Sequence, residues 1–123
     1  MDVKKIDPAL GLLKEFGKIT NGTSDHIHKM RQSSIFTDGV ILAKHKILGS
    51  MLWSISARCE PCIKYYVAQA VKHGVTEQEL GEFLALASTM GGCVGEMWAL
   101  KAYQAFKHPG ESDGKEPDLS CCQ

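Results

Sequence analysis

Two cysteines, Cys59 and Cys62, stand near the middle of the chain with Glu60 and Pro61 between them. Proline lacks an N–H and disfavours helical geometry at the residue before it, so we predict that a helix begins at this pair. Thiols three residues apart share a helical face and can close a small disulfide ring. A helix N-terminus also favours a thiolate, because its free N–H groups and its dipole stabilise an anion. The pair therefore predicts redox chemistry.

Two other uses of the cysteines stay open, a structural metal site and a buried pair without chemistry. Zinc would need two further ligands at short spacing, and none follows. The chain has five cysteines, an odd number whose distribution does not resemble a secreted disulfide framework. We expect Cys93 to be a small buried residue. Cys121 and Cys122 form either an inert tail or a thiol shuttle to the main pair.

A reactive thiol needs help to ionise, because its ordinary pKa is roughly 8.5. Tyr66 lies four residues after Cys62, so its hydroxyl can share a helical face with the sulfur. A phenol with a pKa of about 10 conducts a proton well when a carboxylate backs it. The candidate groups are Glu96 first, because it stands in an apolar segment, then Glu60 and then His45. Core packing for Tyr66 and a structural or subunit contact for Glu96 are the competing interpretations.

Apolar residues recur at helical spacing through most of the chain, and no segment has the alternation of a strand. Turn and cap residues divide this pattern into six predicted helices. They begin near Pro8, after Gly22, after Gly39, at the cysteine pair, after Thr76 and near Val94. We therefore predict an all-α, six-helix bundle that forms a single domain over residues 1–108. The polar segment 109–123 is expected to be a mobile tail.

The composition narrows the class of protein. A chain of 123 residues is long enough for one domain with a real core. Lys and Arg balance Asp and Glu at 14 each, so no net charge attracts nucleic acid or an anionic membrane. The first residues lack the apolar core of a signal peptide, and the apolar runs are short for a bilayer span. We expect a cytoplasmic protein without metal or other cofactor.

Residues 35–106 resemble the carboxymuconolactone decarboxylase and alkylhydroperoxidase D-like family. The resemblance rests on a lysine-flanked apolar helix that leads into Cys59 and Cys62, on the Gly-Val-Thr-Glu-Gln-Glu-Leu turn at 74–80, and on the Met-Gly-Gly at 90–92. It implies an alkylhydroperoxidase D-like helical bundle. Redox-active members reduce peroxides or pass electrons through the cysteine pair, and they are oligomers, so the resemblance also implies a homotrimer or a homohexamer.

The chain departs from the family's proton relay. That relay uses a glutamate twelve residues before the first cysteine and a histidine four residues after the second. Here Ile47 and Tyr66 occupy these two positions. Either the protein is a relative with little redox activity, or other residues have replaced the relay.

The resulting prediction is a thiol-dependent (alkyl hydro)peroxidase or disulfide oxidoreductase in antioxidant defence. Cys62 attacks the peroxide, Cys59 forms the disulfide, and a thioredoxin-like or dithiol partner reduces it. The attacking sulfur stays open, because the helix terminus favours Cys59 whereas Tyr66 favours Cys62. The alternatives are an electron-transfer adaptor for a separate peroxiredoxin and a decarboxylase-like relative that binds a small molecule. Val40, Ile41 and Trp98 are expected to be exposed apolar residues available for subunit contacts, with core packing as the other interpretation for Trp98.

Overall fold

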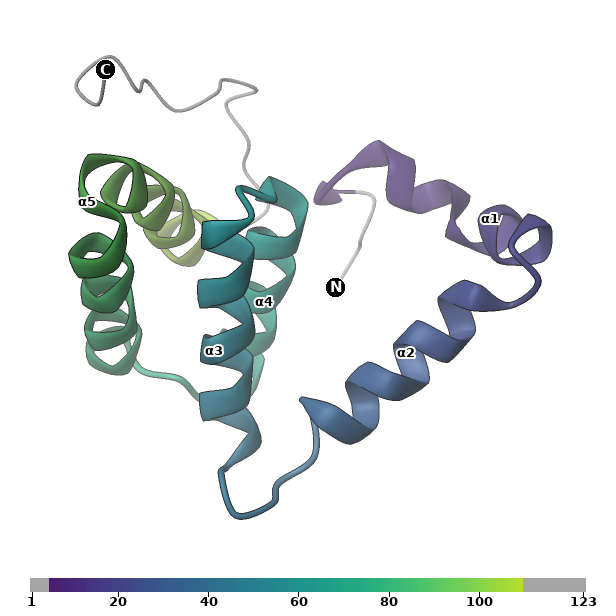
Figure 1. The fold of residues 1–123 in the computed structure, drawn as a ribbon, viewed down its shortest axis with the longest axis horizontal. Coiled ribbons are helices and arrows are strands. Elements are labelled where there is room, and N and C mark those ends of the chain that lie inside the picture. The colour runs from purple at the N-terminus through teal and green to yellow at the C-terminus, as the bar shows by residue number, and fades with distance from the viewer. Residues whose placement is uncertain (1–4, 110–123) are drawn as a thin grey trace.

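The computed structural model describes residues 5–109, and all of its regular elements are helices. In chain order they are the 3-10 turn η2 (Pro8–Leu12), α1 (Leu13–Ile19), α2 (Thr23–Ser34), α3 (Ala43–Ser56), α4 (Glu60–Lys72) and α5 (Glu77–Lys107). Helices α3, α4 and α5 pack together, while η2, α1 and α2 extend from them as an arm (Figure 1). The all-α prediction is confirmed, and the cysteine pair lies in the packed part.

The predicted fifth and sixth helices form one long element, α5, which is broken at Gly92. The φ of Gly92 is 59° and its ψ is −141°, a backbone conformation that favours glycine. The predicted stop at Gly91 and Gly92 thus falls at a real break, but the count of six helices is not confirmed. The break turns the helix back on itself, so that Tyr103 near its end donates a hydrogen bond to Glu77 in its first turn at 2.7 Å.

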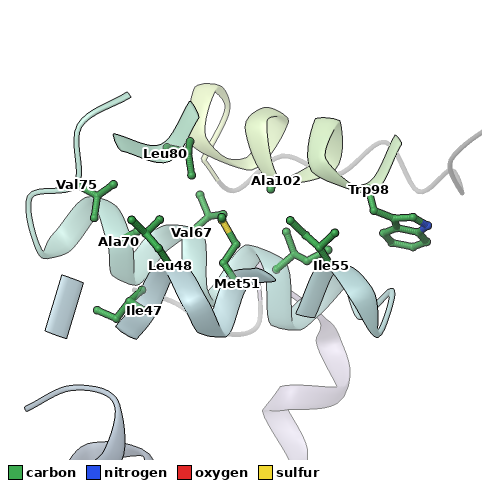
Figure 2. Close-up of a cluster of buried hydrophobic side chains, with 11 residues drawn as sticks. Ile47, Leu48, Met51, Ile55, Val67, Ala70, Val75, Leu80, Trp98 and Ala102 are labelled. Carbon is green, nitrogen blue, oxygen red and sulfur yellow. The ribbon is translucent and has the colours of Figure 1, made fainter. Parts of the chain in front are cut away.

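The hydrophobic core lies between α3, α4 and α5 (Figure 2). Its fully buried members include Ile47, Leu48 and Met51, which lie at helical spacing on α3. Trp98 of α5 is also buried in this cluster, so of its two interpretations core packing is confirmed and an exposed position was wrong. The core therefore holds α3 and α4 side by side, and with them the turn that carries the cysteines.

The arm formed by η2, α1 and α2 has no buried residue. It begins as predicted, since Asp7 caps the first turn by accepting a hydrogen bond from the Ala9 N–H at 2.9 Å. Its apolar side chains, among them Phe16 and Met30, remain exposed. Val40 and Ile41, in the loop that follows the arm, are exposed as predicted. No part of the chain that the structure describes covers this apolar surface.

Glu79 fixes the start of α5. Its carboxylate accepts a hydrogen bond from the Thr76 N–H at 3.0 Å, while the Thr76 hydroxyl accepts one from the Glu79 N–H at 3.1 Å. The two bonds form a capping box, and the helix begins after Thr76 as predicted. Lys44 of α3 adds an ion pair at 2.8 Å. The hydrogen bond from Lys44 is the main reason that the pKa of Glu79 falls to about 2, with the Thr76 N–H second.

The Glu79→Gln variant is expected to be less stable than the wild type at neutral pH and to lose part of the pH dependence of stability. A carboxylate whose pKa is lowered on folding stabilises the folded state above its unfolded pKa of about 4.5 and loses this contribution as the pH falls toward about 2. Urea unfolding between pH 2 and 7 measures the difference. Glu82→Gln is the matched control, because Glu82 lies exposed on the same helix and pairs with no cation in the described part. Parallel stability profiles for the wild type and Glu79→Gln would contradict the assignment.

Candidate functional site

A disulfide joins Cys59 and Cys62, whose Cα atoms lie 5.2 Å apart. Cys59 is the N-cap residue of α4, so the helix begins at the pair as predicted. The turn from α3 is tight: Arg58 has a φ of 55°, and the Cys59 N–H donates to the carbonyl oxygen of Ser54 at 3.0 Å. The core and this turn together fix the position of the pair at the junction of α3 and α4.

Cys62 opens into a cavity of about 280 Å³ between α2, α3 and α4, which we call the Cys62 cavity. Its lining residues come from all three helices and are Arg31, Ile35, Ser50, Trp53, Ser54, Cys62 and Tyr66. The structure thus brings Tyr66 and Cys62 together, as their spacing predicted. Cys59 does not line the cavity, so the two sulfurs have different surroundings.

Aromatic packing holds Tyr66 in place. Its ring stacks on Phe36, with centroids 6.5 Å apart and planes at 17°, and meets Tyr65 edge-on at 5.1 Å. Burial raises the pKa of Tyr65, and the neighbouring Tyr66 raises it further, while the charge of Arg31 lowers it. Tyr66 therefore has a packing role, and this packing also directs it to the wall of the Cys62 cavity.

The two serines in the cavity wall donate their hydroxyl protons within α3. Ser54, which is buried, donates to the carbonyl oxygen of Ser50 at 2.8 Å, and Ser50 donates to that of Lys46 at 2.9 Å. Their oxygens are left as acceptors toward the cavity. The sequence interpretation missed both serines, although two hydroxyls one turn apart in an apolar helix were a usable signal. It also missed Arg31, for which no local signal existed.

The three groups predicted to support Tyr66 do not line the Cys62 cavity. Glu60 pairs with Lys64 at 3.2 Å and Lys101 at 4.0 Å. Glu96 is exposed and lines a separate cavity of about 190 Å³ that contains neither cysteine. His45 lies in the first turn of α3, at the end of this helix that is far from Cys59. Its Nε2 atom is 4.0 Å from a carboxylate oxygen of Glu79.

Within residues 5–109, no carboxylate lines the Cys62 cavity. The catalytic roles of Glu60 and Glu96 therefore stay predictions, and so does that of His45. The prediction for Cys93 was wrong, because this cysteine is free and exposed. The described part holds no group of three or more His, Cys, Asp or Glu residues suited to a metal ion. Cys121 and Cys122 lie outside the described residues.

The sequence profile of the Carboxymuconolactone decarboxylase family matches residues 24–105. The chain belongs to this family. The family predicted from the resemblance over residues 35–106 is therefore confirmed, and the match reaches further toward the N-terminus, into α2. The family includes decarboxylases and alkylhydroperoxidase D-like peroxidases, so membership is compatible with more than one activity.

A solved structure has the same fold. It is the apo form of a carboxymuconolactone decarboxylase family protein of Legionella pneumophila, 27% identical in sequence with a TM-score of 0.79. The superposition covers 88% of this chain and 96% of that one. An uncharacterized protein of Cupriavidus necator is 35% identical over 69 residues, which are 56% of this chain and 61% of the relative. The chain thus matches less than two thirds of that relative's length.

Proposed function

We propose that this family member is a thiol-dependent peroxidase or disulfide oxidoreductase that works through Cys59 and Cys62. The observation that carries the proposal is the position of Cys62, which is within disulfide reach of Cys59 and also lines a cavity with Tyr66 and Arg31. A peroxide in this cavity would meet one sulfur of the pair while the other stays outside it.

The reaction has three balanced steps. The Cys62 thiolate attacks a peroxide oxygen, the O–O bond breaks, and the products are a Cys62 sulfenic acid and an alkoxide that takes up a proton. The Cys59 thiol then displaces water from the sulfenic acid and forms the disulfide. A thioredoxin-like or dithiol partner reduces the disulfide by exchange and becomes oxidised itself.

The local field, rather than a glutamate–histidine relay, is proposed to ionise Cys62. Ile47, at the relay's glutamate position, is fully buried and apolar. The N-terminus of α4 and the charge of Arg31 both favour an anion at the sulfur. The Tyr66 hydroxyl can pass a proton to the departing alkoxide.

The test is to reduce the full-length protein, add one equivalent of hydroperoxide, and map the cysteines by mass spectrometry. We expect two thiols per chain to be lost from Cys59 and Cys62, and a dithiol to restore them. If both cysteines remain reduced, the peroxidase proposal fails and the decarboxylase-like alternative gains. If the disulfide forms but no dithiol supports turnover with peroxide, the adaptor for a separate peroxiredoxin is the better description.

The chain is also proposed to assemble as a homotrimer or homohexamer. The arm leaves apolar side chains uncovered, and a second, mostly apolar cavity of about 760 Å³ lies between α3 and α5. Two of its lining residues, Trp53 and Met90, are 69% and 87% exposed. A further chain that covers these surfaces would remove them from water. Sedimentation equilibrium measures the mass, and a monomer would contradict this proposal.

Helix α5 is long and apolar enough to cross a membrane, judged by length and composition alone. The expectation that no apolar segment reaches this length was therefore too strong. Only 17% of the segment that meets this test is buried, but α5 is broken at Gly92 and packs against α3 and α4. We propose that its exposed apolar surface contacts another subunit, and that the protein works in the reducing cytoplasm, where a dithiol donor is available.

A further inference from the structure

Arg31 is the charged side chain in the wall of the Cys62 cavity. It comes from the last turns of α2, the part of the arm nearest to the core in the sequence. Within residues 5–109, no carboxylate lies within ion-pair distance of its guanidinium. A guanidinium without a carboxylate partner beside a reactive sulfur is a binding group for an anion.

The wall of the Cys62 cavity contains both hydrogen-bond acceptors and hydrogen-bond donors, and together they indicate which ligand would fit. Ser50 and Ser54 have already donated their protons to α3, so their oxygens accept. The side chains of the wall that can donate are the Arg31 guanidinium, the Tyr66 hydroxyl and the Trp53 indole N–H, and of these Arg31 alone carries a charge. A ligand that satisfies this wall carries an oxyanion for Arg31 and an O–H or S–H for the serine oxygens. A hydroperoxide or thiol that bears a carboxylate has both.

We propose that the Cys62 cavity selects small substrates that carry a carboxylate, which Arg31 holds while the reactive group faces the Cys62 sulfur. A cavity of about 280 Å³ is at the small end of ligand sites, so the molecule has few heavy atoms. The identity of the substrate as a peroxide rests on the proposed function, whereas the recognition of its anionic group does not.

The selectivity can be measured without any peroxide, by alkylation with iodoacetate and iodoacetamide. In each reaction the Cys62 thiolate displaces iodide and forms a thioether, but only iodoacetate carries a carboxylate. Both reagents consume the same thiolate, so a change in the pKa of Cys62 cancels in the ratio of their rates. Mass spectrometry of the reduced full-length protein follows Cys62 alone among the five cysteines.

Arg31→Gln is expected to lower the ratio of the iodoacetate rate to the iodoacetamide rate at least about fivefold, as the loss of a charge-assisted contact does. Arg31→Lys should retain part of the ratio, because it keeps the charge and loses the planar fork. Lys29→Gln is the matched control: it removes the same charge from an exposed position on α2 that does not line the cavity.

An unchanged ratio in Arg31→Gln would overturn the inference. An equal loss in Lys29→Gln would overturn it too, because a general field of the helix would then be responsible. The outcome is separate from that of the proposed function. A ratio that depends on Arg31 in a protein inert to peroxide would leave the anion site standing and remove the peroxidase. A protein that cycles with peroxide but whose rate ratio does not depend on Arg31 would leave the peroxidase standing and remove the anion site.

Discussion

Gly95→Ala is expected to destabilise the folded protein by about 3 kcal/mol, the upper end of the cost of overpacking a core. Gly95 is buried in the second half of α5, where the break at Gly92 has turned the chain back. A Cβ atom on Gly95 would overlap the carbonyl oxygen of Ala87 in the first half. Two segments of backbone would have to separate, and Leu80 and Trp98 would lose contacts in the core.

Gly81→Ala is the matched control for this prediction. Gly81 lies exposed in the first half of α5, and a Cβ atom there would meet nothing within 4 Å. Alanine is the better helix former by roughly 0.5–1 kcal/mol, so this variant should be slightly more stable than the wild type. Denaturant unfolding measures both free energies. Equal effects of the two substitutions would mean that the halves of α5 are not in close contact at Gly95.

The same region shows what the sequence can predict about the fold. The pair Gly91 and Gly92 marked the place where the helix changes direction, because consecutive glycines are a local signal. The sequence could not decide between two helices and one broken helix, since the conformation of Gly92 between the two segments depends on the final geometry. The need for glycine at position 95 depends on Ala87 in the other half of α5, and a single sequence carries no record of such a contact.

The helical spacing of apolar residues predicted which side chains are buried in some helices but not in others. The stripe of α3 that contains Ile47 and Met51 is buried because both α4 and α5 pack on it. For Trp98 the sequence left the core and a subunit contact both open, and the return of α5 places it in the core. The apolar residues of α1 and α2 follow helical spacing equally well and remain exposed. Periodicity defines an apolar face, but it does not say which surface covers that face.

Some residues of the candidate site could likewise be predicted from the sequence, and others could not. Cys62 and Tyr66 are one helical turn apart on α4, so local geometry alone predicted that they share a helical face, and the structure adds that both line one cavity. Arg31 reaches the same cavity from α2, through the loop and the packing of α2's end against the core, and only the structure reveals it. Glu96 was chosen because it stands in an apolar segment, but the turn of α5 gives it a place in a different cavity.

In Cys62→Ser, the remaining Cys59 thiol is expected to react with one equivalent of hydroperoxide at least about a hundredfold more slowly than the wild-type pair does, because Cys59 lacks the groups of the cavity. Cys59→Ser should keep the first step within a few-fold of the wild-type rate. It should then stop at a sulfenic acid, which dimedone traps with loss of water. Cys93→Ser is the control, since this exposed thiol lies outside the Cys62 cavity.

The opposite pattern would assign the attack to Cys59. That outcome has a physical basis of its own, because Cys59 is the N-cap residue of α4 and the helix terminus lowers the pKa of a thiol there. The comparison of the two serine variants therefore decides between the field of the helix and the groups of the cavity as the main source of reactivity.

Tyr66→Phe separates the hydroxyl of Tyr66 from its ring. Phenylalanine keeps the stack on Phe36 and the edge contact with Tyr65, so the free energy of unfolding should change little. If the hydroxyl conducts a proton to the departing alkoxide, the oxidation rate should fall at least about tenfold. Thiol loss after rapid mixing with hydroperoxide gives the rate, and Tyr65→Phe is the matched control, because Tyr65 does not line the cavity. An unchanged rate in Tyr66→Phe would leave this residue with packing alone, and the proton would then have to come from solvent.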